Sequence, residues 1–174
     1  MLKLKIFFTF VFIVFVAHVV YVKDGDTIRV QDDLDQRVYD IRFYGMDAPE
    51  HGQAGGPEAK AYLQSLIDRK QIRLSVHGGD RYGRLVCEVY TMDGLYVNSE
   101  MIKTGNAWYY EAFAKNDNML KNLQAQAQKD KIGLWAEDNP VNPSEWRKIQ
   151  REAATAKALL DNIKIIKASE SEDD

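Results

Sequence analysis

Several short strand-like segments, followed by helix-like segments without βαβ alternation, restrict the folds open to this chain. β-Rich runs flank the turn signal Asp24–Gly25, which predicts a hairpin. Three further strands are predicted at residues 37–46, 71–78 and 85–94. In the first of these, Ile41 and Phe43 face one side and Arg42 faces the other. This order predicts an α+β domain built on a small antiparallel sheet or barrel.

Three helices are predicted within the same domain. The first begins near Pro57 and continues for about three turns, with an apolar face formed by Ala59, Tyr62, Leu63, Leu66 and Ile67. A short helix at residues 97–105 is stopped by Gly105. The third helix is predicted at residues 116–135, with a buried side formed by Leu120, Leu123, Ala127 and Leu134.

The length of 174 residues, 45% of them hydrophobic, suits one domain with a substantial core and terminal extensions. The single cysteine, Cys87, excludes an internal disulfide and any metal site made of several cysteines. We therefore predict that Cys87 is a packing residue in a strand. One barrel without internal repeats also suggests a monomer.

The N-terminal segment, residues 1–17, has the pattern of an export signal. Lys3 and Lys5 precede residues 6–17, which contain one polar side chain, Thr9. Cleavage after Ala17 would release the domain into the periplasm or the medium. The apolar stretch is shorter than the roughly 20 residues that span a bilayer, but residues 18–22 would extend it, so an uncleaved membrane anchor is the alternative.

Residues 148–174 form a C-terminal extension of different character. Ala156, Leu159, Ile163 and Ile166 recur at helical spacing. We predict that this stripe packs on the domain, with a partner or membrane contact as the alternative. The last residues, 168–174, form an acidic segment typical of disorder.

Two polar clusters carry the candidate chemistry. Asp24 and Asp26 lie in the first, and the second, residues 40–50, contains Arg42, Asp47 and Glu50. Hard cations such as Ca²⁺ bind carboxylate and carbonyl oxygens, and Asp26 and Asp47 could supply two of them from different strand ends. The sequence has no HExxH or His-Asn-His spacing, which removes common zinc and ββα-metal sites as alternatives.

Five segments resemble, in order and spacing, the thermonuclease (staphylococcal nuclease-like) family. They are VVYVKDGDTIRV, IRFYGMDAPE, GGPEAKAYL, DRYGR and GLWAEDNPVNPSEWRK. The resemblance covers residues 18–147. It implies an oligonucleotide/oligosaccharide-binding-type barrel of five strands with three helices. It also implies a calcium-dependent endonuclease that acts on DNA and RNA, preferably single-stranded or unwound, and leaves 3′-phosphate products.

The resemblance also assigns roles to individual residues. Asp26, Asp47 and the main-chain carbonyl of Ala48 match the positions that hold Ca²⁺, with alanine standing where the best-known members have threonine. The remaining catalytic positions are matched by Arg42, Glu50 and Arg84. The two arginines would bind the reacting phosphate, and Glu50 would accept a proton from water or order that water.

Substrate contacts follow from the same resemblance. Arg81 and Tyr82 match positions that contact a terminal phosphate, and Phe113 falls near a nucleoside-stacking tyrosine. A phenylalanine ring could stack on a base, while a core or subsite wall is the alternative. We interpret His51 as a loop residue and His18 and His77 as structural.

Charge favours an enzyme over a pure binding module. Residues 18–147 carry 16 lysine and arginine residues against 20 aspartate and glutamate residues, a difference of −4. Nucleic-acid binders gain affinity from basic side chains that release counterions, so binding should be weak and sensitive to salt. A non-catalytic, nuclease-like module that binds nucleic acid or protein is the alternative function, but it would have no need for Arg42, Glu50 and Arg84 together.

Overall fold

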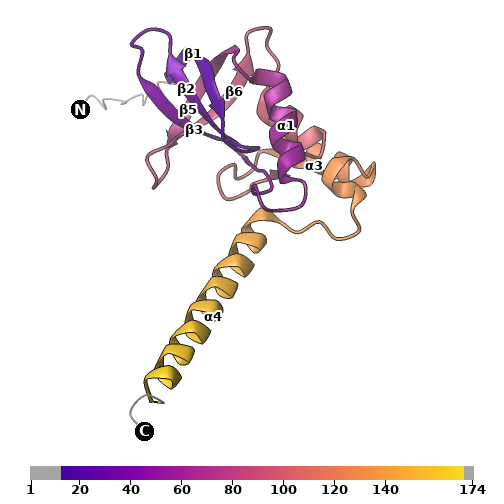
Figure 1. Ribbon diagram of the computed structural model, residues 1–174. Helices are drawn as coiled ribbons and strands as arrows, with labels where there is room; N and C mark the ends of the chain where they lie inside the picture. The colour runs from indigo at the N-terminus through magenta and orange to yellow at the C-terminus, as the bar shows by residue number, and fades with distance from the viewer. Residues whose placement is uncertain (1–12, 171–174) are drawn as a thin grey trace, which may run out of the picture. The chain divides into compact units, whose positions relative to one another are not determined.

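A closed five-stranded β-barrel forms the core of the unit that ends at Asp138 (Figure 1). The computed structural model describes residues 13–170, with side chains described to residue 164. The strands are adjacent in the order β1 (Ile13–Val22), β2 (Thr27–Asp32), β3 (Val38–Phe43), β6 (Leu85–Thr91) and β5 (Gln71–Gly79). Pairing of β1 with β5 closes the barrel, and β3 and β6 are the parallel pair. The predicted α+β barrel is confirmed.

The described residues also form helices and short strands outside the barrel. The helices are α1 (Gly56–Ile67), α2 (Val97–Lys103), α3 (Asn118–Lys129) and α4 (Pro143–Glu170). A small second sheet pairs β4 (Met46–Asp47) with β7 (Trp108–Tyr109), and one 3₁₀ turn, η1, covers Gly133–Ala136. Among the helices of residues 13–170, none combines the length and apolar character needed to cross a membrane.

Strand alternation explains how the core is filled. Ile41 and Phe43 are buried inside the barrel, and Arg42 between them faces the other side, as predicted. Cys87 is also fully buried in β6, which confirms its packing role, and burial raises the pKa of its thiol to about 12. The α1 helix begins around Pro57 and buries Ala59, Leu63 and Ile67 against the core.

The third helix is shorter than predicted. It ends at Lys129, and Leu134 lies in the separate turn η1. Lys131 and Gly133 both have positive φ angles, which an α-helix does not accommodate. The backbone of Gly133 also lies close to that of Gly105. A Cβ atom added at Gly133 would lie 2.6 Å from the Gly105 carbonyl oxygen. Periodicity alone did not reveal this close backbone contact.

The C-terminal part of the chain, from Asn139 onward, is assigned to a unit of its own, separate from the unit that ends at Asp138. Its helix α4 begins at Pro143, before the predicted boundary at residue 148. Asn142 caps α4, accepting hydrogen bonds from the backbone N–H and hydroxyl of Ser144. Leu159 and Ile163 are exposed on α4, and their packing on the domain stays a prediction. Ile166 and the acidic tip lie beyond the described side chains.

The first strand begins inside the predicted export signal. Ile13 to Ala17 belong to β1, where they pair with residues 72–76 of β5, while residues 1–12 lie outside the described part. Ala17 is fully buried, and the ring of Phe15 lies edge-on to that of Tyr39 with centroids 5.9 Å apart. A chain that begins at His18 would therefore lack five of the six residue pairs between β1 and β5.

Two truncations test the contribution of these residues. Removal of residues 1–12 should leave the thermal unfolding midpoint nearly unchanged, because the barrel stays closed. Removal of residues 1–17 should cost most of the folding free energy, which for a single domain is about 5–15 kcal/mol. Circular dichroism melts of the two proteins make the comparison. Equal midpoints would contradict a structural role for Ile13–Ala17.

Candidate active site

The strand register brings the predicted arginines and aspartates to one end of the barrel. Thr27, the first residue of β2, lies opposite Arg42 of β3, and Arg42 in turn lies opposite Val86 of β6. Asp26 directly precedes β2, and Arg84 directly precedes β6. Neighbouring strands thus place residues that are far apart in sequence beside each other.

The Asp24–Thr27 turn is shaped by a close approach at Gly25. A Cβ atom added at Gly25 would lie 2.7 Å from the Cβ of Ala48 and 3.0 Å from that of Ala59. Glycine therefore allows the turn to lie against both the loop after β4 and the α1 helix. The Asp24 carboxylate accepts a hydrogen bond from the backbone N–H of Asp26 at 3.1 Å. The turn is therefore packed against the protein, and it places Asp26 beside the second polar cluster, residues 40–50.

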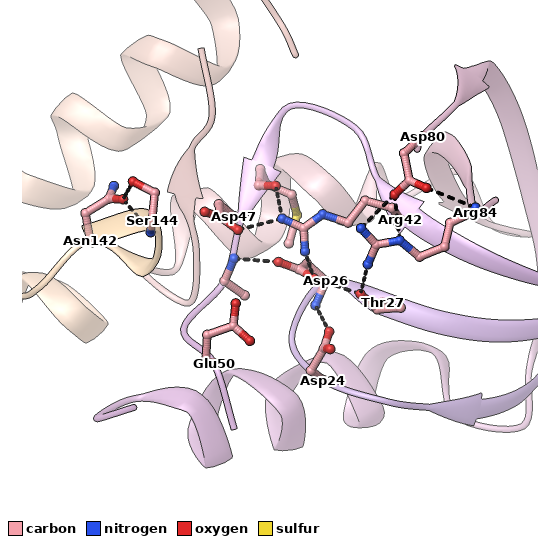
Figure 2. Close-up of polar contacts among 12 residues, drawn as sticks. Asp24, Asp26, Thr27, Arg42, Asp47, Glu50, Asp80, Arg84, Asn142 and Ser144 are labelled. Atoms are coloured by element: carbon pink, nitrogen blue, oxygen red, sulfur yellow. Dashed lines mark hydrogen bonds and ion pairs between the residues drawn. The ribbon is translucent and has the colours of Figure 1, made fainter. Parts of the chain in front are cut away.

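Arg42 joins the two buried aspartates (Figure 2). Its Nη2 lies 2.5 Å from Oδ1 of Asp47, and its Nη1 is paired with Oδ1 of Asp26. Asp26 and Asp47 are only 3% and 1% exposed. The second oxygen of Asp26 accepts a hydrogen bond from the backbone N–H of Ala48 at 2.8 Å. All three residues predicted to hold the metal ion thus meet at one point.

Three carboxyl groups lie near the guanidinium of Arg42. Asp26 and Asp47 pair with it directly, and Asp24 lies close by. Burial raises the pKa of Asp24, while Arg42 and the hydrogen bonds with Thr27 act in the opposite direction. Two buried carboxylates thus share one guanidinium.

A compact loop positions Glu50. Gln53, which is 6% exposed, accepts a hydrogen bond from the backbone N–H of Glu50 through its side-chain oxygen at 3.2 Å, and its own N–H donates to the Glu50 carbonyl at 2.9 Å. A Cβ atom at Gly56 would lie 2.0 Å from that carbonyl oxygen, so only glycine fits there. The half-buried Glu50 side chain extends from this loop in Figure 2.

Arg84 is held in a tight turn by Asp80. The Asp80 carboxylate accepts a hydrogen bond from Nε of Arg84 at 2.7 Å and also lies 2.7 Å from its Nη2. Nη1 of Arg84 donates to the Thr27 hydroxyl at 3.4 Å, and that hydroxyl donates to Asp26 at 3.0 Å. Hydrogen bonds therefore connect Arg84 with the pair formed by Arg42 and Asp26.

The residues predicted to contact substrate lie in different places. Tyr82 is 69% exposed, with the guanidinium carbons of Arg81 and Arg84 at 4.9 and 5.5 Å from its ring centroid. Arg81 and Tyr82 therefore lie beside Arg84, and their contact with a phosphate stays a prediction. Phe113 is 49% exposed, and its ring centroid lies 5.2 Å from that of Tyr110. Within residues 13–170 its ring contact is with Tyr110, and it is not part of the hydrogen-bonded group around Arg42.

Sequence reasoning missed three residues of this site: Thr27, Gln53 and Asp80. Each acts through short-range hydrogen bonds, which depend on the geometry of turns rather than on periodicity. The signal that the sequence offered for them was their closeness to predicted site residues. Asp80 begins the DRYGR segment, and Gln53 follows Glu50 by three positions. The three histidines lie away from this hydrogen-bonded group within the described chain. His18 pairs with Asp33, His77 stacks on Tyr44, and His51 is an exposed turn residue.

Comparison with known proteins agrees with this geometry. Residues 40–137, more than half of the chain, match the model of the family described as staphylococcal nuclease homologue. The chain belongs to the staphylococcal nuclease family. The match includes Arg42, Asp47, Glu50 and Arg84, and it ends within the unit that contains the barrel.

Similar proteins of this family occur in bacteria and plants. An uncharacterized endonuclease of Escherichia coli O157:H7 is 40% identical over 131 residues, covering 75% of this chain and 84% of that protein. One from Haemophilus influenzae is 37% identical over 135 residues, covering 78% and 74%. The staphylococcal-like nuclease CAN1 of Arabidopsis thaliana is 39% identical over 111 residues, covering 64% of this chain and 34% of the plant protein.

The donor set fits a calcium ion. The two buried carboxylates supply hard oxygen donors, the main chain of Ala48 lies beside Asp26 through its N–H, and calcium completes its coordination with water. Among residues 13–170, no group of three or more histidine, cysteine, aspartate or glutamate side chains forms a metal site. The ion pairs of Asp26 and Asp47 with Arg42 show that both carboxylates point toward a cation.

Proposed function

We propose that this chain is an exported, calcium-dependent endonuclease that hydrolyses phosphodiester bonds in DNA and RNA and leaves 3′-phosphate products. Membership of the staphylococcal nuclease family supports phosphodiester hydrolysis. The observation that carries the proposal is the meeting of Arg42 and Arg84 with buried Asp26 and Asp47 at one end of the barrel. Two arginines beside an acidic cation site suit a phosphate group that carries a metal ion.

The arginines and Glu50 divide the chemistry between them. The guanidinium groups of Arg42 and Arg84 bind phosphate oxygens and stabilise the charge that builds up in the transition state. Glu50 accepts a proton from the attacking water or orders that water. The P–O5′ bond then breaks, and Arg84 stabilises the leaving oxygen. The products end in a 3′-phosphate and a 5′-hydroxyl group, and the reaction requires no 2′-hydroxyl.

Asp26, Asp47 and the Ala48 carbonyl would hold the calcium ion. When bound, the ion would supply a positive charge that polarises the phosphate. Binding it requires that Arg42 share or release the two aspartates, which frees its guanidinium for a phosphate oxygen. Exposed Tyr82 and Arg81 beside Arg84 would contact a neighbouring phosphate. We propose a monomer that prefers single-stranded or unwound nucleic acid, whose backbone can enter this end of the barrel.

Export is proposed from the apolar segment of residues 6–17. Because Ile13–Ala17 lie in β1, a cleavage site that leaves the barrel intact lies before Ile13. An uncleaved segment would instead tether the active domain to a membrane. The chemistry proposed for the site is the same in both cases.

A nuclease assay with and without a calcium chelator tests the proposed function. The purified chain should degrade single-stranded DNA and RNA in calcium, lose activity in excess EDTA and regain it when calcium is restored. Asp47→Ala should be inactive, whereas Asp93→Ala, a matched change at an exposed turn residue, should retain activity. Full activity in excess EDTA would contradict the calcium assignment. Failure to cleave either nucleic acid with calcium present would contradict the nuclease proposal.

A further inference from the structure

Asp80 lies outside the residues to which family resemblance gives a role, yet its carboxylate accepts several hydrogen bonds in the site. One carboxylate oxygen accepts from the backbone N–H groups of Tyr82 and Arg84 at 2.8 and 3.1 Å. The other lies 2.7 Å from both Nε and Nη2 of the Arg84 side chain. The Asp80 side chain is only 7% exposed. A single carboxylate thus fixes both the turn and the arginine at its end.

The two carboxylate oxygens of Asp80 accept hydrogen bonds from different groups. The first stabilises the turn, which the backbone also closes through Gly83 N–H to the Asp80 carbonyl and Asp80 N–H to the Arg84 carbonyl. Gly83 has a φ of +80°, which glycine adopts without strain. Among the described residues, the second oxygen makes its polar contacts with the guanidinium group. The turn and the orientation of Arg84 can therefore be separated by changing one oxygen.

The orientation of the guanidinium follows from which of its edges Asp80 occupies. A guanidinium is planar and carries five N–H donors in a fixed fork. Asp80 takes the edge formed by Nε and Nη2, so Nη1 is directed to the Thr27 hydroxyl at 3.4 Å (Figure 2). Thr27 in turn donates to Asp26. Arg84 consequently presents its remaining donors to the acidic cluster where the substrate phosphate would lie.

We propose that Asp80 is the positioning residue for Arg84 and fixes the guanidinium so that its Nη1 side faces the scissile phosphate. The inference rests on the proposed nuclease function, which assigns Arg84 to the phosphate. A free arginine side chain has several rotatable bonds, and ordering it during the reaction would cost conformational entropy. Holding it in place beforehand leaves its charge where negative charge develops.

Asp80 also has the charge that this role requires. Burial by itself would raise the pKa of its carboxyl, but hydrogen bonds from the Arg84 side chain and from the backbone N–H groups of Arg84 and Tyr82 hold the pKa below its usual value. The group is therefore a carboxylate at neutral pH.

Asp80→Asn separates orientation from folding. The asparagine side-chain oxygen can still accept from the backbone of Tyr82 and Arg84, while its NH₂ group cannot accept from Arg84. We expect kcat on a single-stranded DNA oligonucleotide in calcium to fall by about 10- to 100-fold, since small displacements of a positioned group cost about that much. KM and the unfolding midpoint should change little. Asp80→Ser, whose hydroxyl can also accept from the turn backbone, provides a second variant if asparagine destabilises the fold.

Asp35→Asn is a matched control. Like Asp80, Asp35 accepts a hydrogen bond from a backbone N–H two residues later in the chain and forms an ion pair with an arginine, Arg37. This pair lies in the exposed β2–β3 hairpin. Its kcat should stay within about twofold of the unchanged protein, because exposed pairs contribute little.

A double-mutant cycle with Arg84→Ala distinguishes positioning from a general structural role. If Asp80 acts through Arg84, adding Asp80→Asn to Arg84→Ala should lower kcat no further. An equal loss in both backgrounds, or normal kcat in both Asp80 variants, would overturn the proposal. An unchanged protein that fails to cleave DNA and RNA in calcium would instead refute the proposed function on which it rests.

Discussion

Glu50→Gln should lower kcat for oligonucleotide cleavage by about 10²- to 10⁴-fold, the range for loss of a general base. Glutamine keeps the size of the side chain and leaves the Gln53 contact to the Glu50 backbone intact, so the loop should hold its shape. KM should change little, because Glu50 acts on water rather than on the bound phosphate. Steady-state kinetics on a single-stranded DNA oligonucleotide in calcium give both quantities.

Glu58→Gln is the control for this change, because Glu58 is an exposed glutamate in the first turn of α1. It should have normal kcat. Activity of the Glu50→Gln protein equal to that of the unchanged chain would show that Glu50 does not accept the proton.

Arg42→Ala should affect both activity and stability. Loss of a preorganised charge in the transition state lowers kcat by about 10²- to 10³-fold, and loss of a phosphate contact in the bound state also raises KM. The guanidinium is 12% exposed and joins Asp26 and Asp47. Removing one partner of a buried ion pair costs about 3 kcal/mol or more. The variant should therefore unfold at lower temperature without calcium, and calcium should restore more stability to it than to the unchanged protein.

Kinetics and thermal melts, each with calcium and with chelator, test both effects. Arg29→Ala is the control, since Arg29 forms an exposed pair with Asp40 on the same strands. It should behave like the unchanged protein. An Arg42→Ala protein with normal kcat would contradict the phosphate role. One that calcium stabilises no more than it stabilises the unchanged chain would contradict the placement of the ion beside Asp26 and Asp47.

Local patterns predicted the parts of the fold that depend on local preferences. Alternation in β3 correctly placed Ile41 and Phe43 inside the barrel and Arg42 outside. Helical spacing and Pro57 correctly gave α1. The same spacing failed for Leu134, because helix α3 ends at Lys129. Gly133, just beyond that end, lies against the backbone of Gly105, which is far away in sequence. Long-range backbone contacts leave no periodic signal.

The ordered motifs predicted the candidate site residues, whereas only the structure showed which residues hold them in place by hydrogen bonds. The motifs named Asp26, Asp47 and Arg42, and the structure brings them into contact. Asp80 and Gln53 were missed because a turn aspartate or a loop glutamine is common, and only the folded chain shows which atoms they hold. The strand role of Ile13–Ala17 was hidden because an apolar strand and an export signal have similar composition.

Mass spectrometry of a digested single-stranded DNA oligonucleotide tests the central claim most directly. In calcium, the purified chain should produce fragments that end in a 3′-phosphate and a 5′-hydroxyl group, because the proposed reaction breaks the P–O5′ bond. Glu50→Gln and chelator-treated samples should leave the oligonucleotide intact over the same period. Fragments with 5′-phosphate ends, or equal digestion by the Glu50→Gln protein, would contradict the chemistry assigned to Arg42, Glu50 and Arg84.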